Sequence, residues 1–323
     1  MKLWALGILV ALSTPAFSVN SRATVSGDTQ ASLLALQRDD QRVADTSWRI
    51  ASRNASTCPK LWAALGVSLH HVSQYEPEYR AAAQAAFGLD ETYPSLLAVA
   101  DGSPASAASL KPNDTLRAVN GADLADKSRG QKGTASYGAV SSAMAALEAL
   151  PEKGEAVLSI ERGGQQLEVS VTPQNVCRSR VELAPGNAIN ANANGLVAQI
   201  SGRLVDWVGS DDELALVIAH EMAHNLLDHP KRLNEKSPLS GLATSLGLAG
   251  KAQRQMELEA DRVGIIMAAG AGYNYKIAPD FWARLNSNSP LASFLATTHP
   301  TTRARRENAQ RVVDELNAEN LNR

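Results

Sequence analysis

Apolar residues recur at helical spacing in several stretches of the chain. Between residues 28 and 55 they alternate with charged residues every three or four positions, which predicts an amphipathic helix. Similar spacing predicts helices over 78–86, over 137–150 before Pro151, and from 303 onward. We expect the helices at both ends of the chain to be structural and to pack one apolar face against the rest.

Between about Gly88 and Pro173 the pattern changes to short apolar runs separated by turn residues. Residues 96–99 and 115–119 are predicted to form strands, and two further runs, 156–160 and 167–171, read as a hairpin across Arg162-Gly163-Gly164-Gln165. Because helical segments precede and follow this region, we expect an α+β protein with an inserted β-rich domain.

The order of motifs in this region resembles that of a bacterial PDZ domain. The resemblance is carried by Ala-Asp-Gly-Ser-Pro-Ala at 100–105, Leu-Lys-Pro-Asn-Asp at 110–114 and Val-Asn-Gly at 119–121. Ser109 and Asn113 stand where the family usually has glycine, and no clear carboxylate-binding loop is visible. The resemblance implies that an extended peptide adds to the domain as a strand. A spacer domain that only positions the catalytic part is the alternative.

The first eighteen residues predict a secretory signal peptide. Lys2 precedes the apolar run from Leu3 to Leu12, and Pro15 and Ala16-Phe17-Ser18 follow, with cleavage expected after Ser18. The apolar run is about half of the roughly 20 residues that a spanning helix needs. We therefore expect an exported, periplasmic or secreted protein with no integral membrane span after cleavage. A retained N-terminal anchor is the alternative.

Charge and cysteine content refine this picture. A net charge of −2 over 323 residues gives no basic field, so nucleic acid is not an expected partner. Cys58 and Cys177 form an even pair, and in an oxidising compartment we expect them to form a disulfide. They stand just outside the ends of the β-rich domain, where a disulfide would close its base. Two buried free thiols are the alternative.

The run from Ile218 to His224 carries the candidate catalytic chemistry. Residues four apart lie on one face of a helix, so His220 and His224 can bind one metal ion. Glu221 follows the first histidine and is placed to take a proton from zinc-bound water. This HExxH spacing is a metallopeptidase signature. A helix whose histidines bind no metal is the alternative.

The surrounding helix is predicted to be mostly buried. Ser210 and Glu213 form a capping-box pattern at its start, and we expect it to run to about His229, where Pro230 stops it. Many of its residues are apolar, so two unpaired imidazoles within it would be costly, and a bound metal removes that cost.

A hydrolytic zinc site needs a third protein ligand and leaves its fourth position to water. His229 does not complete the long metzincin motif, because Leu227 and Pro230 occupy the positions that this motif gives to glycine and histidine. The third ligand is therefore expected to be a carboxylate further along the chain.

The run from Met256 to Asp261 opens a second helical stretch, which ends near Gly270. Glu257 and Asp261 are four residues apart and share a face of that helix. Glu257 is therefore predicted to be the third ligand, and Asp261 to hold a ligand histidine by its other ring nitrogen. Glu259 points elsewhere and is the alternative ligand.

Together these motifs resemble the HExxH…ExEAD pattern of the HtpX-type and CAAX prenyl protease-like zinc metallopeptidases. His-Glu-Met-Ala-His at 220–224 and Glu-Leu-Glu-Ala-Asp at 257–261 carry the resemblance, and Thr-His-Pro at 298–300 matches a late segment of the family. The match covers roughly residues 196–306 and is closest to the soluble, exported BepA-like members. It implies a mainly helical zincin-type domain with a small edge sheet, one zinc ion, and oxyanion stabilisation by His299.

Four segments are predicted along the chain: a signal peptide (1–18), an N-terminal helical segment (19–87), a PDZ-like domain (88–175) and a zinc metallopeptidase domain (181–323). Residues 231–255 lie between the predicted ligands and form either a mobile lid over the site or a plain connector. The small-residue run 190–195 and the strand after it either accept substrate backbone or are an ordinary loop and strand.

We therefore expect an exported zinc-dependent endopeptidase that hydrolyses protein substrates, with a role in envelope protein quality control. Zinc would be held by His220, His224 and Glu257, with Glu221 as the base and His299 beside the oxyanion. The alternative is a PDZ-based peptide-binding or chaperone-like factor whose proteolysis is weak or gated.

Overall fold

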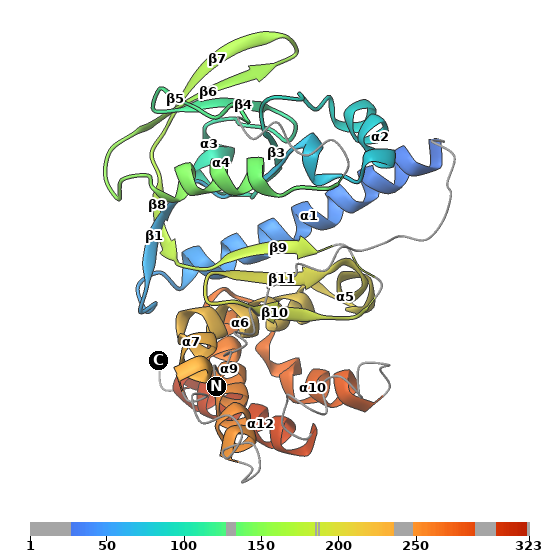
Figure 1. The fold of residues 1–323 in the computed structure, drawn as a ribbon. Coiled ribbons are helices and arrows are strands. Elements are labelled where there is room, and N and C mark those ends of the chain that lie inside the picture. Colours follow the sequence, from blue (N-terminus) through green and yellow to red (C-terminus); the bar gives the residue numbers. More distant parts are fainter. Residues whose placement is uncertain are drawn as a thin grey trace, which may run out of the picture.

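The long helix α1 (Gly27–Arg53) lies between two lobes of the molecule (Figure 1). A computed structural model describes residues 27–126, 134–184, 186, 188–235, 248–287 and 302–321. The sheet lobe (residues 67–171) lies on one side of α1, and the helical lobe (residues 180–321) on the other. The predicted signal peptide 1–18, the predicted His299 and much of the predicted lid lie outside the described residues.

The sheet lobe is built on one antiparallel sheet with the strand order β2-β3-β4-β6-β7. Its strands are β2 (Val67–His70), β3 (Ser95–Val99), β4 (Thr115–Val119), β5 (Ala122–Asp123, paired with β4), β6 (Ala156–Arg162) and β7 (Gln165–Val171). Its helices are η1 (Val72–Gln74), α2 (Pro77–Phe87), α3 (Pro104–Ala107) and α4 (Gly138–Glu148).

The predicted hairpin is present. Ala156, Leu158 and Ile160 alternate along β6 with less buried residues and point into the core of the lobe. Gly163 and Gly164 connect β6 to β7 with φ values of 57° and 78°, which glycine adopts without steric cost. The sheet also takes β2 from within 19–87, so the first strand of the lobe precedes the Gly88 boundary that the sequence suggested.

Helix α1 supplies hydrogen-bond partners to β3, which β4 pairs only at Ser95. The Gln41 amide donates to the Val99 carbonyl (2.8 Å) and accepts from the Val99 N–H (3.2 Å). Gln37 donates to the Leu97 carbonyl at 3.0 Å. The N-terminal helix is therefore fastened to the sheet lobe by its polar face.

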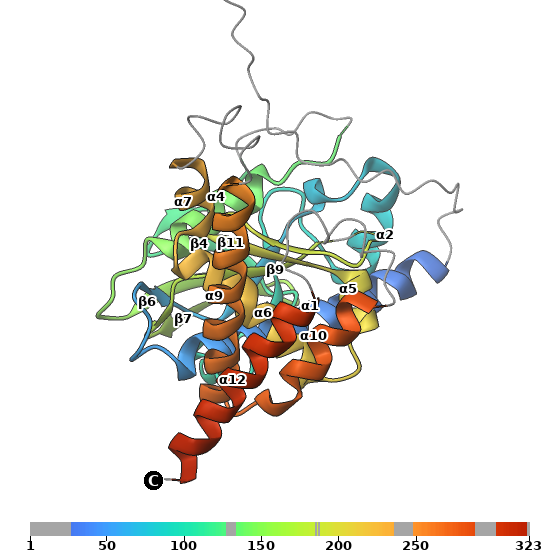
Figure 2. The ribbon, with the colours of Figure 1, turned by 90° about the horizontal axis from the view of Figure 1, so that it is seen from below.

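The helical lobe begins with a three-stranded sheet of order β10-β11-β9. It consists of β9 (Arg180–Ala184), β10 (Ala191–Ala193) and β11 (Val197–Ser201), with β11 parallel to β9 and antiparallel to β10. The helices that follow are α5 (Gly202–Trp207), α6 (Asp211–Leu226), α7 (His229–Glu235), α9 (Leu248–Gly270), η2 (Tyr275–Ile277), α10 (Ala278–Ser287) and α12 (Thr302–Leu321). Seen from below, α12 lies between α9 and α10 (Figure 2).

The zinc-motif helix ends earlier than its sequence suggested. α6 stops at Leu226, Asp228 adopts a left-handed conformation (φ 56°), and α7 begins at His229. Pro230 is thus the second residue of a new helix and not the residue that ends the old one. Proline is tolerated in the first turn of a helix, where its missing N–H has no intrahelical partner to lose.

A short two-stranded ladder and a disulfide close the base of the sheet lobe. β1 (Leu61–Ala64) pairs antiparallel with β8 (Gln174–Cys177), with Leu61 opposite Cys177. Cys58 and Cys177 are joined in a disulfide with a Cα–Cα distance of 5.5 Å, as predicted. The α+β class is also confirmed. Among the described residues, no helix has both the length and the apolar character to cross a membrane.

Replacing both Cys58 and Cys177 with alanine should lower the free energy of unfolding. The bond links residues 119 apart in sequence, and a closed loop of about this length is worth about 4–5 kcal/mol in the chain-entropy description. Urea unfolding of the double variant and the wild type measures the loss. The wild type in reducing buffer should match the double variant, and a double variant as stable as the oxidised wild type would contradict the prediction.

Candidate active site

Helix α6 carries the HExxH residues into the interior of the helical lobe. The Ser210 hydroxyl caps its start by accepting from the Glu213 N–H at 3.3 Å, as the sequence suggested, and the Glu213 carboxylate accepts from the Gly209 N–H at 2.6 Å. Most of the helix is buried, including His220 and Glu221, while the His224 side chain keeps some exposure. The motif therefore faces neighbouring helices for most of its length.

Helix α9 crosses α6 unusually closely at Gly264. A Cβ atom at this position would lie 2.9 Å from the His220 nitrogen and 3.0 Å from the His220 Cα, closer than side chains approach a backbone. Glu257 and Asp261 precede Gly264 on the same face of α9 by about two turns and one turn. The bare backbone at Gly264 thus brings both carboxylates within reach of the α6 histidines.

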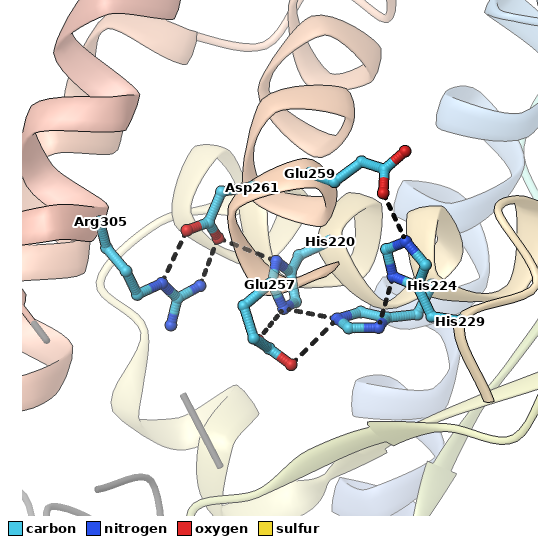
Figure 3. Close-up of polar contacts among 7 residues, drawn as sticks. All are labelled: His220, His224, His229, Glu257, Glu259, Asp261 and Arg305. Atoms are coloured by element: carbon cyan, nitrogen blue, oxygen red, sulfur yellow. Dashed lines mark hydrogen bonds and ion pairs between the residues drawn. The ribbon is translucent and has the colours of Figure 1, made fainter. Parts of the chain in front are cut away.

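The structure brings His220, His224 and Glu257 together (Figure 3). The Nε2 atoms of the two histidines lie 3.1 Å apart. The Glu257 carboxylate lies 3.4 Å from Nε2 of His220 and 3.7 Å from Nε2 of His224. One ligand atom from each residue falls within 4.8 Å of the others, so all three can face a common point.

This group fits a zinc ion. Two imidazole nitrogens and one carboxylate oxygen are a common catalytic zinc set, which leaves a fourth position for water. Burial alone would lower the pKa of His220, but hydrogen bonds to Asp261 and Glu257 outweigh it and raise that pKa to about 9. The surroundings of His220 therefore favour positive charge close to the ring, as a metal centre requires. The predicted His-His-Glu site for zinc is present.

Asp261, which the sequence predicts to support a ligand histidine, lies beside His220. Nδ1 of His220 lies 2.9 Å from Asp261 Oδ1, on the side of the ring away from Glu257. Arg305 of α12 binds both Asp261 oxygens, one of them at 2.8 Å through Nε. Burial alone would raise the pKa of Asp261, but the Arg305 guanidinium and His220 together outweigh it and lower that pKa. Arg305 also stacks on the Trp282 ring, 3.8 Å from its centre.

Glu221 lies outside the group of ligand atoms and is 6% exposed. Burial raises the pKa of its carboxyl to about 7, against the lowering effect of His220. A carboxyl group whose pKa lies near neutral pH can both accept and return a proton, which suits a general acid–base residue.

His229 and Glu259, considered as ligands from the sequence, lie on the far side of the His224 ring from Glu257 (Figure 3). Nδ1 of His229 is 3.1 Å from Nδ1 of His224, and Nε2 of His229 is 3.2 Å from Glu259. Neither residue belongs to the metal-ligand group among the described residues. The neighbouring pair His70 and His71 is likewise outside that group, and these two rings contact Tyr75 and Ser73 instead.

The sequence did not indicate that Arg305 and Trp282 belong to the site. A signal for Arg305 was present: it lies at helical spacing from the buried Ala309, Val312 and Val313 and so belongs to the buried face of α12. Trp282 carried no comparable signal, because its place in the site depends on a contact with Arg305, which is distant in sequence.

Comparison with known proteins matches the helical lobe to a peptidase family. Residues 171–240 and 233–313 match the sequence profile of "Peptidase family M48". The mitochondrial metalloendopeptidase OMA1 of Arabidopsis thaliana is 29% identical over 129 residues, which cover 32% of this chain and 26% of that protein. The mitochondrial metalloendopeptidase OMA1 of Saccharomyces cerevisiae is 28% identical over 132 residues, which cover 33% of this chain and 38% of that protein. OMA1 of Schizosaccharomyces pombe is 28% identical over 116 residues, which cover 29% of this chain and 34% of that protein.

These matches support the predicted enzyme class, a zinc metalloendopeptidase. Each aligned region spans well under half of the relative's own length. The predicted periplasmic or secreted location is wrong, because the relatives are mitochondrial enzymes. The apolar run at the N-terminus reports hydrophobicity only, and hydrophobicity does not identify a compartment.

Gly264→Ala should weaken zinc binding. The new Cβ would force α9 away from the His220 backbone and would carry Glu257 with it. Overpacking of this kind costs on the order of 1–3 kcal/mol, and we expect zinc affinity to fall by about tenfold or more. Alanine is the better helix former, so a loss cannot come from helix propensity.

Competition with a chromophoric chelator measures the zinc affinity of the Gly264→Ala variant. Ile266→Ala, on the exposed side of the same helix, is the matched control and should bind zinc as the wild type does. Unchanged affinity in Gly264→Ala would show that the close crossing does not position Glu257.

Proposed function

From the peptidase family M48 domain that residues 171–313 carry, we propose that this chain is a zinc-dependent endopeptidase acting on protein substrates. One observation carries the proposal: the Nε2 atoms of His220 and His224 and the Glu257 carboxylate converge, and the buried Glu221 directly follows His220 on α6. A part in protein quality control is a further step of the proposal, which rests on the sequence resemblance alone.

In this proposal His220, His224 and Glu257 hold the zinc ion, and Asp261 orients His220. When bound, zinc acts as a Lewis acid and makes water a nucleophile near neutral pH. Glu221 accepts the proton of the attacking water and returns it to the leaving amine, which its raised pKa suits. His299 is proposed from the resemblance to stabilise the oxyanion.

An extended substrate is supported by the position of β10. This strand is an edge of its sheet, pairs only with β11 among the described strands, and packs against α6. Its residues Ala191–Ala193 have short side chains, so a peptide backbone could approach closely. An extended peptide that adds to a free edge is held by main-chain hydrogen bonds, which are tolerant of sequence.

The second candidate function is peptide binding by the sheet lobe, as a PDZ-like or chaperone-like factor with weak or gated proteolysis. It is favoured by β2, which forms an edge of the sheet and lies beside α4. The crevice there has a volume of about 100 Å³ and is also lined by Trp48 of α1 and Val181 of β9. A peptide would need these elements to move apart, so we rank this function second.

Glu221→Gln should keep zinc and lose hydrolysis. Glutamine preserves the shape of the side chain but cannot accept the proton, and general acid–base catalysis contributes about 10²–10⁴-fold. Degradation of an unfolded casein-like protein, with zinc content measured on the same sample, tests this. Glu168→Gln in the sheet lobe is the control. Full activity in a zinc-loaded Glu221→Gln variant would remove Glu221 from the mechanism.

Zinc removal should separate the two candidate functions. A chelator should stop casein degradation, and added zinc should restore it. The peptide-binding function would be favoured instead by two results together. The zinc-free full chain would bind unstructured peptides saturably, and the zinc-restored chain would hydrolyse them little. Hydrolysis that survives complete removal of the metal would contradict the zinc mechanism.

A further inference from the structure

The two predicted ligand histidines are supported by different groups. His220 is held through Nδ1 by the Asp261 carboxylate, which Arg305 binds in turn. Nδ1 of His224 lies 3.1 Å from Nδ1 of His229. The second ligand is thus supported by a third histidine, which the zinc mechanism itself does not use.

The direction of each hydrogen bond follows from the chemistry of imidazole. A histidine that binds a metal through Nε2 is neutral and carries its remaining proton on Nδ1. His224 must therefore donate from Nδ1, and Nδ1 of His229 must accept. His229 then carries its proton on Nε2, which lies 3.2 Å from Glu259 Oε2 and donates to it.

Glu259 is held in its turn by Arg232. The Arg232 guanidinium donates to Glu259 Oε2 at 3.1 Å, the same oxygen that accepts from His229. Arg232 lies one turn beyond His229 on α7, so both face Glu259 on α9. A carboxylate oxygen can accept hydrogen bonds from both donors at once.

The backbone fixes His229 at this place. Asp228 is left-handed, which ends the α6 region and turns the chain so that α7 starts at His229. The ring is buried, with 3% of the residue exposed. Both ring nitrogens meet partners within this burial, as a buried polar side chain requires.

We propose that His229 is a positioning residue for the metal centre. It accepts the Nδ1 proton of His224 and so holds that ring in the tautomer and orientation that direct Nε2 to zinc. Glu259 and Arg232 hold His229 in the matching tautomer. The inference rests on the proposed function, because it takes His224 to be a zinc ligand.

Two replacements of His229 test whether this residue acts as a hydrogen-bond acceptor for His224 or only fills space. His229→Leu fills much of the volume without an acceptor, and zinc affinity should fall by about 10–100-fold, as is usual when a partner of a metal ligand is removed. His229→Asn places an amide oxygen as many bonds from the backbone as Nδ1 and should recover most of that loss. Equal losses in both variants, or no loss in His229→Leu, would overturn the proposal.

The readouts do not depend on catalysis. Chelator competition gives the zinc affinity, and the visible spectrum of the cobalt-substituted protein reports the ligand geometry. His229→Leu should change the cobalt spectrum, and His229→Asn should resemble the wild type. Thermal unfolding of the zinc-free proteins tests whether His229 has a purely structural role. A large decrease in the melting temperature of zinc-free His229→Leu, together with unchanged zinc affinity, would show that His229 only contributes to packing.

Two controls complete the design. Glu259→Ala should weaken zinc binding less than His229→Leu does. Arg262 lies on α9, as Glu259 does, and forms an exposed ion pair with Glu315 of α12. Arg262→Ala should leave zinc binding unchanged. Equal zinc affinities of the Glu259→Ala and Arg262→Ala variants would show that Glu259 does not help to hold His229. His224→Ala tests the premise separately: stoichiometric zinc binding that survives this change would sink the proposed zinc site, whatever the His229 variants show.

Discussion

The helical lobe depends on ionisable groups that are buried together where α9 crosses α6. His220, Glu221, Glu257, Asp261 and Arg305 are all buried at this crossing. Taking an ionised group out of water costs several kcal/mol unless partners compensate for it. Arg305 neutralises Asp261, but Glu257 faces two imidazoles that have to be neutral to bind metal. A divalent cation among them would supply the positive charge that compensates Glu257. The stability of this helix packing and the occupancy of the metal site are therefore linked.

What the sequence predicts well here is local. Ser210 as the cap, His220 and His224 on one face, and Glu257 with Asp261 one turn apart all depend on separations of three or four residues, which the helix period converts directly into geometry. The β6–β7 hairpin is local too, since Gly163-Gly164 both predicts and forms the turn. The choice of Glu257 over Glu259 followed from the same period, and Glu259 lies on the other side of His224.

What the sequence left open is set by contacts between distant segments. Asp261 and Arg305 are 44 residues apart, and only the buried face of α12 hinted that the arginine points inward. β2 and β9 are short strands, and neither pairs with the strand that directly follows it in a hairpin of two or three residues, so their own residues do not identify them. The sequence places His229 at the end of α6, because a proline at position 230 is a usual signal for the end of a helix. The left-handed Asp228 ends the helix first and turns His229 towards His224.

The metal helix is also tied to the base of the sheet lobe. Asn225, directly after the second predicted ligand, is buried and donates to the Ser179 hydroxyl at 2.9 Å, while its side-chain oxygen accepts from the Gly195 N–H at 2.6 Å. Ser179 follows the disulfide residue Cys177 by two positions and leads into β9. The disulfide, the start of β9 and the turn before β11 are therefore connected to the helix turn that carries His224. Because each of these contacts is short and mostly buried, a displacement of the sheet lobe at its base would have to break them or move His224 with it.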